Sequence, residues 1–273
     1  MEEAWERAWG RHTGTDRFSK PFDDLWRNRG PKWLPALFLN STWVETGKRL
    51  IVSNLKLMPE DFNDAEDLNR FYTRESLPLS AAVHLSARFT YISPAGTLKK
   101  NGRIYGLAVD GGYFENSGET TVIEILQAID DLADNDTDWK KVKPVVIHIS
   151  NEPVDPKYTK TDLAAEDKDK AVRPEPFLNE ALSPVMTMLN TRNARAVYAR
   201  ETVMWHVGKE NFLHFGLCRN AMSPPLGWVL SSAVQKQLDG QLCNKSAVFN
   251  NPENIKRIRE FLKNRYAGVS PNR

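Results

Sequence analysis

The sequence predicts an α/β domain, because two short apolar runs flank one amphipathic helix. Ile104–Val109 is a continuous apolar run that stops at Asp110, and Val145–Ile149 is a second such run. Between them, apolar side chains recur at helical spacing from about Glu119 to Ala133. Strand, helix and strand in this order predict a right-handed crossover between two parallel, neighbouring or near-neighbouring strands of one central sheet.

Composition places the chain among ordinary folded proteins. Of its 273 residues, 41% are hydrophobic and 26% are charged, which excludes a wholly disordered chain and a disulfide scaffold. The net charge of +2 gives no indication of nucleic-acid binding. Cys218 and Cys243 lack metal-ligand spacing, and we expect both to be buried as small apolar residues.

The first residues and the apolar runs bear on where the protein is located. The start, MEEAWERAWG, is acidic where a secretory signal is basic and then apolar. The apolar runs are much shorter than the ~20 residues that a membrane-spanning helix needs. We therefore expect a cytoplasmic or membrane-associated protein without a signal peptide or a transmembrane helix in this chain.

A tryptophan-rich lead-in over 1–34 is expected to precede a single domain over 35–273. Trp5 and Trp9 are four residues apart, so they share one face of a short helix. We interpret these aromatic residues as a means of fixing a loop-rich segment onto the core. A helix lying in a membrane interface is the alternative, but it needs a longer apolar face.

The remaining elements follow from local patterns. Pro35–Val44 and Lys48–Leu57 are strand-like around a tight corner, residues 59–76 are a polar surface loop or short helix, and Pro78–Phe89 is a helix that begins behind a proline. Residues 151–176 are rich in charge and proline and predict a mobile loop. Further on, the patterns predict helices at Pro176–Val207, Pro225–Leu238 and Asn254–Tyr266 and a strand at Phe212–Leu217.

Most motifs that carry chemistry are missing from the sequence. Five residues separate Gly112 from Gly118 where a phosphate-binding loop has four, and Glu119 occupies the place of the lysine. The sequence contains no GxGxxG, HExxH, EF-hand or paired CxxC motif, so we expect no cofactor and no metal. It also lacks GxSxG, the turn that exposes an activated serine.

One candidate site is left, at Asp110-Gly111-Gly112. This triplet follows a predicted strand, at the end where open α/β sheets bind their ligands. The two glycines allow a sharp turn beside the carboxylate. Taken alone, the triplet indicates either a simple turn or a site at which the aspartate is a catalytic base, with room for a ligand beside its carboxylate.

Three segments together carry a resemblance to a known family. They are Asn40-Ser41-Thr42 with the following ETGKR, LPLSAAVHLSARFTYISPAG at 77–96, and VDGGYFENSGETT at 109–121. In combination they resemble the patatin-like phospholipase family, and PPLGWVLS at 224–231 resembles a further stretch of its larger bacterial members. The resemblance is good over about 35–125 and loose elsewhere.

The resemblance implies a lipid acyl hydrolase that works with a Ser–Asp dyad and no histidine. Asp110 matches the dyad aspartate, a general base, and Gly111 and Gly112 complete its motif. The implied fold has three layers around a mainly parallel sheet, with Asp110 at the tip of a parallel strand. The implied substrate is a lipid or another acyl ester, taken from solution or from a membrane surface.

The chain departs from the family pattern at its beginning. In the family, a glycine-rich oxyanion loop and the GxSxG serine precede the region matched by Pro35–Val44, and the first 34 residues contain neither. The fold is therefore expected to lack its N-terminal strands, and no nucleophile is assigned in this chain. Three interpretations stay open: a carboxyl-terminal fragment, a pseudoenzyme that binds lipid or protein without catalysis, or a chain whose serine comes from a separate polypeptide.

Overall fold

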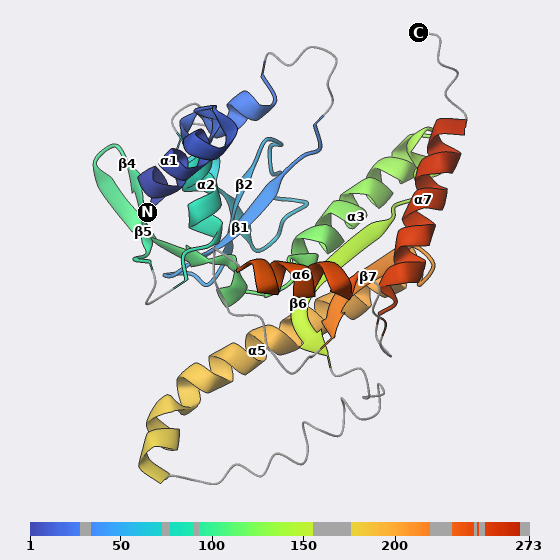
Figure 1. Ribbon diagram of the computed structural model, residues 1–273. Helices are drawn as coiled ribbons and strands as arrows, with labels where there is room; N and C mark the ends of the chain where they lie inside the picture. Colours follow the sequence, from blue (N-terminus) through green and yellow to red (C-terminus); the bar gives the residue numbers. More distant parts are fainter. Residues whose placement is uncertain are drawn as a thin grey trace. The chain divides into compact units, whose positions relative to one another are not determined.

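The computed structural model describes residues 1–27, 34–72, 77–89, 93–154, 176–218, 231–242, 245 and 249–267, without the side chains of 151–154, 176–182, 185–186, 189 and 264–267. This part of the chain is mixed α/β (Figure 1). Its contacts divide it into two units, Met1–Val142 with Glu180–Thr202 and Lys143–Asn179 with Val203–Arg273. Helix α5 (Pro176–Val207) contributes to both units.

A five-stranded mixed sheet forms the centre of the first unit. Its strands are β1 (Phe38–Trp43), β2 (Arg49–Ser53), β3 (Ala65–Asp67), β4 (Gly96–Lys100) and β5 (Arg103–Asp110). They are arranged in the order β3-β2-β1-β5-β4. Strand β1 is antiparallel to β2 and β5, β4 is antiparallel to β5, and only β3 runs parallel to its neighbour β2.

Helices and short 3-10 turns surround this sheet. The helices are α1 (Glu2–Thr13), α2 (Leu79–Ser86) and α3 (Glu119–Asn135). The 3-10 turns are η1 (Arg17–Ser19), η2 (Phe22–Leu25), η3 (Leu68–Arg70), η4 (Gly111–Tyr113) and η5 (Trp139–Lys141).

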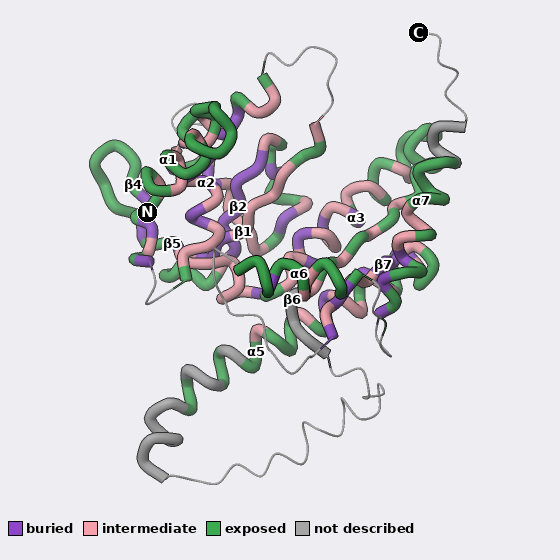
Figure 2. The backbone as a smooth tube through the Cα atoms, in the orientation of Figure 1, coloured by how far each residue is buried: buried purple, intermediate pink, exposed green. Residues whose placement is uncertain are grey.

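One face of the sheet packs against α2 and the lead-in. Side chains alternate along a strand, so Leu50 and Val52 of β2 and Ala108 of β5 lie on the same face. They join a buried cluster with residues of α2 and with Phe22 of η2, whose exposed fraction is 1%. Figure 2 shows the buried residues of β2 and α2 next to one another.

The opposite face of the sheet packs against α3. Ile51 of β2 forms a smaller buried cluster with Leu57 and Phe62, and Ile125 of α3 packs on it. The first unit therefore has α2 on one face of its sheet and α3 on the other, and the mixed α/β class expected from the sequence is confirmed.

The lead-in docks onto α2 through polar and aromatic side chains spaced about one helical turn apart. Oε1 of Glu2 lies 2.7 Å from Nδ1 of His84 and accepts a hydrogen bond from Nη2 of Arg88 at 2.7 Å. Burial alone would raise the pKa of the Glu2 carboxyl, but His84 and Arg88 lower it to about 2. The Trp5 ring meets the His84 ring at 5.0 Å, edge to face. The expected attachment of this tryptophan-rich segment to the core is confirmed.

A buried guanidinium joins the sheet to α3. Arg49 is 2% exposed, and its Nη2 bonds Oε1 of Glu124 at 2.6 Å as well as the carboxylate of Asp64. Nη1 of Arg49 donates to the Thr121 hydroxyl at 2.8 Å. Burial alone would lower the pKa of Arg49, but its bonds to Glu124 and Asp64 raise it, so the group stays charged.

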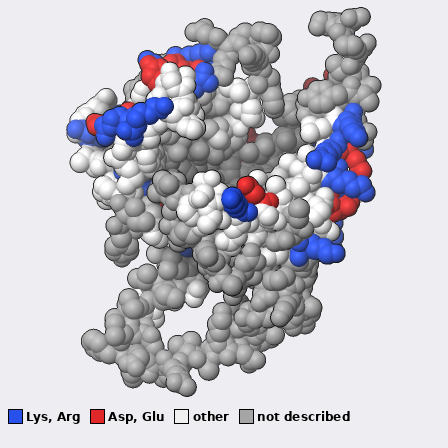
Figure 3. Space-filling view, viewed as in Figure 1, with Lys and Arg blue, Asp and Glu red and all other residues white. Residues whose placement is uncertain are grey.

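The second unit is built on two parallel strands, β6 (Val146–Val154) and β7 (Phe212–Cys218), with Val146 opposite Phe212. Two helices accompany them, α6 (Ser232–Gln241) and α7 (Asn251–Ala267). Buried Asn251 joins strand and helices, because its Nδ2 donates to the carbonyls of Gly216 at 2.9 Å and Gln241 at 2.8 Å. Along α7, acidic and basic residues are interspersed (Figure 3).

Most predicted elements are present at the expected places. The strands β1, β2, β5, β6 and β7 and the helices α1, α2, α3, α5 and α7 overlap their predicted ranges. Cys218 is buried, as expected. Cys243, residues 155–175 of the predicted loop and residues 225–230 of the predicted helix lie outside the described residues.

The predicted crossover is wrong. Strand β5 belongs to the five-stranded sheet and is antiparallel to both neighbours, whereas β6 pairs with β7 in a separate sheet. Asp110 therefore ends an antiparallel strand, not a parallel one. The strand–helix–strand segment that does produce parallel neighbours is β6, α5 and β7.

Two further corrections concern short segments. The stretch 59–76, expected to be a polar surface loop or short helix, contains β3 and η3 and buries Phe62, Leu68 and Phe71. Strand β4 was not predicted, although Asn101-Gly102 is a strong hairpin signal. These two residues have φ of 49° and 77°, as the tight turn between β4 and β5 requires.

We predict that Arg49→Met lowers the free energy of unfolding by about 3–5 kcal/mol, because it leaves the Glu124 carboxylate buried without its cation. Urea unfolding at pH 7 measures this. Arg103→Met, at an exposed position in β5, is the control and should change stability by less than ~0.5 kcal/mol. The double variant Arg49→Met/Glu124→Leu should recover much of the loss. Equal effects of the two arginine variants would contradict the prediction.

Candidate functional site

Asp110 forms the turn at the end of β5. Its Oδ1 accepts a hydrogen bond from the Gly112 N–H at 2.7 Å, which caps the first turn of η4. Its own backbone N–H donates to the carbonyl of Arg88 at 3.1 Å. The carboxylate is thus held in one orientation by the turn that follows it.

The two glycines of the motif are packed against different kinds of atom, backbone at Gly111 and a side chain at Gly112. A Cβ added at Gly111 would lie 2.4 Å from the backbone oxygen of Asn40, and one added at Gly112 would lie 2.9 Å from Oδ1 of Asp110. Backbone atoms of a central strand cannot move aside without disturbing the sheet. The glycine at position 111 is therefore explained by the close approach of η4 to β1.

The three segments that carry the family resemblance meet at Asn40. Its carbonyl accepts a hydrogen bond from the Ser86 hydroxyl at 2.6 Å, and its Oδ1 accepts one from the Thr121 hydroxyl at 3.1 Å. The Phe89 and Tyr113 rings stack at 6.1 Å. Segments that are far apart in the sequence thus form one packed junction beside Asp110.

A buried carboxylate closes this junction at the start of α3. Glu115 accepts hydrogen bonds from the backbone N–H groups of Ser117, Glu119 and Thr120 at 2.8–3.0 Å and from the hydroxyls of Ser117 and Thr120. Burial alone would raise its pKa, but these hydrogen bonds lower it. Glu115 therefore satisfies the unpaired N–H groups at the helix N-terminus.

Asp110 has the electrostatic character of a base, but its carboxylate accepts no hydrogen bond from a hydroxyl of the described residues. Burial raises its pKa, against the smaller lowering effects of the Gly112 N–H and the charge of Arg192. Three serines near Asp110 in sequence are engaged elsewhere: Ser80 with Glu6, Ser86 with Asn40 and Ser117 with Glu115.

A fourth serine lies closer to Asp110 in the sheet. Ser41 of β1 is directly opposite Asp110 in register, so both side chains are on the same face. Its hydroxyl is buried, with 1% of the residue exposed, and has no hydrogen-bond partner among the described residues. Ser41 is part of a straight strand and is closed off from substrate in this arrangement.

A cavity of the first unit lies on the other face of the sheet. It has a volume of about 790 Å³, and apolar side chains form most of its wall: Val44, Ala95, Leu107, Val109, Tyr113 and Met188. Because side chains alternate along β5, Leu107 and Val109 face this groove, whereas Ala108 and Asp110 belong to the opposite face. Asp110 does not line the groove.

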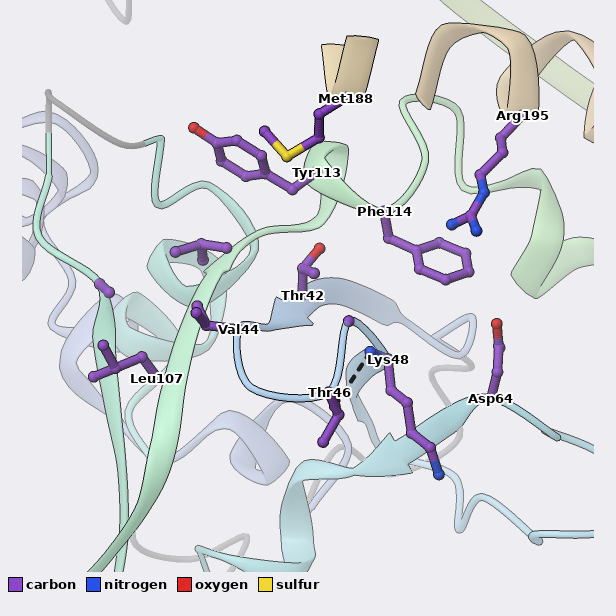
Figure 4. Close-up of a pocket in the computed structure, with 13 residues that line it drawn as sticks. Thr42, Val44, Thr46, Lys48, Asp64, Leu107, Tyr113, Phe114, Met188 and Arg195 are labelled. Carbon is purple, nitrogen blue, oxygen red and sulfur yellow. Dashed lines mark hydrogen bonds between the residues drawn. The ribbon is translucent and has the colours of Figure 1, made fainter. Parts of the chain in front are cut away.

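Charged side chains gather at one end of the groove. Figure 4 shows Lys48, Asp64 and Arg195 on the side away from Val44 and Leu107. The guanidinium of Arg195 lies over the Phe114 ring at 4.8 Å, and Arg49 lies near the same ring at 5.4 Å. The Asp64 carboxylate is already paired with Arg49.

Asp110, Gly111 and Gly112 thus form one turn. This turn does not place the Asp110 side chain in the groove that could hold a ligand. Sequence reasoning did not identify Arg195, since it occurs in a helix recognised by its apolar residues. A signal was present in the pair Arg192 and Arg195, which are three residues apart on α5.

Two features of the described residues bear on other kinds of site. No three His, Cys, Asp or Glu side chains there are grouped so that they could hold a metal ion. No helix within the same ranges is both long enough and apolar enough to cross a membrane. In comparisons with known proteins, neither a family model nor a curated protein matches this chain.

We predict that Gly111→Ala destabilises the chain by about 2 kcal/mol or more, because its Cβ would overlap the Asn40 backbone. Thermal or urea unfolding measures the change. Gly10→Ala is the matched control: its Cβ would have only an ordinary contact at 3.7 Å, in helix α1. That variant should be neutral or more stable by up to ~1 kcal/mol. A neutral Gly111→Ala would show that the turn is not this tightly packed.

Glu115→Gln should cost about 1–3 kcal/mol at pH 7, since it weakens the cap of α3. The folded pKa of Glu115 is lowered, so its charge stabilises the fold fully above the ordinary value of 4.5 and loses this effect as pH falls through the lowered pKa. The difference between wild type and variant should therefore shrink in acid. Glu60→Gln, at an exposed site, should change stability by less than ~0.5 kcal/mol. A pH-independent cost of Glu115→Gln would contradict the role of the charge.

Proposed function

We propose that this chain provides the aspartate base of a lipid acyl hydrolase with a Ser–Asp dyad, whose nucleophile comes from outside residues 1–273. The observation that carries the proposal is the junction around Asn40. There, the three segments that resemble patatin-like phospholipases pack together and position Asp110 at the end of β5. The family assignment is part of the proposal.

In the proposed reaction, a serine hydroxyl attacks the ester carbonyl while Asp110 accepts its proton. Collapse of the intermediate expels the alcohol, to which Asp110 returns the proton. Burial raises the pKa of Asp110, which makes it a stronger base than an exposed aspartate. Backbone N–H groups from the segment that carries the serine stabilise the oxyanion.

A second function is favoured by one observation. The Asp110 carboxylate caps its own turn through Gly112, and none of the serines at 80, 86 and 117 donates to it. This arrangement suits a pseudoenzyme that keeps the aspartate for its structural role and binds lipid or protein without catalysis.

An activity assay tests the hydrolase proposal. The 273-residue chain alone should hydrolyse p-nitrophenyl esters no faster than an unrelated protein, because it has a base without an exposed nucleophile. Adding a segment that contains the glycine-rich loop and GxSxG should produce turnover. In that complete form, Asp110→Asn should lower kcat about 10²–10⁴-fold, whereas the exposed control Asp138→Asn should not.

Two results would reject the proposal. One is ester turnover by the isolated chain with labelling by a fluorophosphonate that Ser41→Ala abolishes, since the nucleophile would then lie in this chain. The other is unchanged turnover of the complete form after Asp110→Asn, which would favour a structural role for the aspartate.

A further inference from the structure

We propose that the groove between β1, β5, η4 and α5 is a binding site for a long-chain fatty acid, with the carboxylate at Arg195 and the chain along the apolar wall. The groove has a volume of about 790 Å³, within the ~300–1,000 Å³ typical of small-molecule sites. It lies on the sheet face opposite Asp110, so the site is distinct from the one considered above.

The wall of the groove is apolar and stays open to solvent. Leu107 is 37% exposed, Val44 50% and Met188 46%, although all three line the same cavity. Exposed apolar side chains that gather in one concave surface indicate a ligand or partner more often than isolated ones do. An alkyl chain in the groove would remove this surface from water.

The two threonine hydroxyls that line the groove are already engaged. The Thr42 hydroxyl donates to the carbonyl of Asp110 at 2.9 Å, and the Thr46 hydroxyl accepts the N–H of Lys48 at 3.2 Å. A sugar or a peptide, which needs many hydrogen bonds along its length, would find few available partners here. An alkyl chain requires none.

The charged end of the groove supplies the head-group contact. Arg195 is exposed, stacks on Phe114 and takes part in no ion pair among the described residues. Lys48 has only a long contact of 3.6 Å to Glu66, and Asp64 is paired with Arg49. The charge that this end of the groove offers to a ligand is therefore positive. A guanidinium binds a carboxylate through two parallel hydrogen bonds, which favours a fatty acid over a neutral lipid.

The binding of two amphiphiles that have the same alkyl chain but different head groups tests this proposal. Isothermal titration calorimetry of the full chain with dodecanoate and with dodecanol separates the charge from the alkyl group. We expect dodecanoate to bind at least about tenfold more tightly than dodecanol, a difference that one ion pair can supply.

Two pairs of variants locate the site. Arg195→Ala should lower the affinity for dodecanoate about tenfold and leave the affinity for dodecanol unchanged. Arg103→Ala, which removes an exposed arginine stacked on Tyr105 at 5.4 Å, should alter neither. Leu107→Asp should abolish binding of both ligands, whereas Ile104→Asp, on the same strand but outside the groove, should not. Circular dichroism establishes that each variant is folded.

Several outcomes would overturn the proposal: no binding of dodecanoate, equal affinity for dodecanol, or equal effects of the two arginine variants. A folded Leu107→Asp variant that still binds would also reject it. Since Asp110 is intact in every variant, these results are independent of the activity assay. A groove that binds dodecanoate beside an inactive Asp110 would leave this inference standing and reject the hydrolase proposal.

Discussion

The buried guanidinium of Arg49 is the interaction on which the first unit most depends. It emerges from β2 on the face opposite the main hydrophobic cluster and holds α3 through Glu124 and Thr121. A buried charge in this position depends on its carboxylate partners. Burial raises the pKa of Glu124, and Arg49 offsets only part of that rise. The contact fixes where α3 begins, and so where the chain between β5 and α3 must turn. Asp110, η4 and the Glu115 cap lie in that short connection.

Sequence patterns predicted the helices well but not how the strands pair. Helix α5 begins and ends at the predicted residues. The error at β5 has a physical cause. A continuous apolar run is typical of a strand buried on both faces, as in parallel sheets. In β5 one face is buried against α2, while the other is apolar because it lines a groove. Leu107 thus resembles a core residue in sequence and is 37% exposed in the fold.

The candidate site was predictable where local sequence determines it. Two adjacent glycines after an aspartate at a strand end require an unusual turn, and the turn is present. The roles of Asn40 and Arg195 were not predictable, because each depends on contacts with residues more than forty positions away in sequence. The same applies to Phe62 and Phe71, which occur in a polar stretch and are buried by neighbours that the local pattern does not specify.

The alternation of side chains along β5 limits how this segment can change in length. Asn101-Gly102 fixes one end of the strand and the contact between Gly111 and Asn40 fixes the other. The pairing of β5 with β4 contains a register shift between Ile104 and Gly106, which can absorb an extra residue. From Gly106 to Asp110 the ladder is regular, so inserting or deleting one residue there would exchange the faces: Leu107 and Val109 would enter the core and Asp110 would turn toward the groove. Inserting or deleting two residues would leave each of these side chains on its present face of the sheet. In related sequences, the distance from the glycine at position 106 to the aspartate should therefore vary in even steps, or not at all.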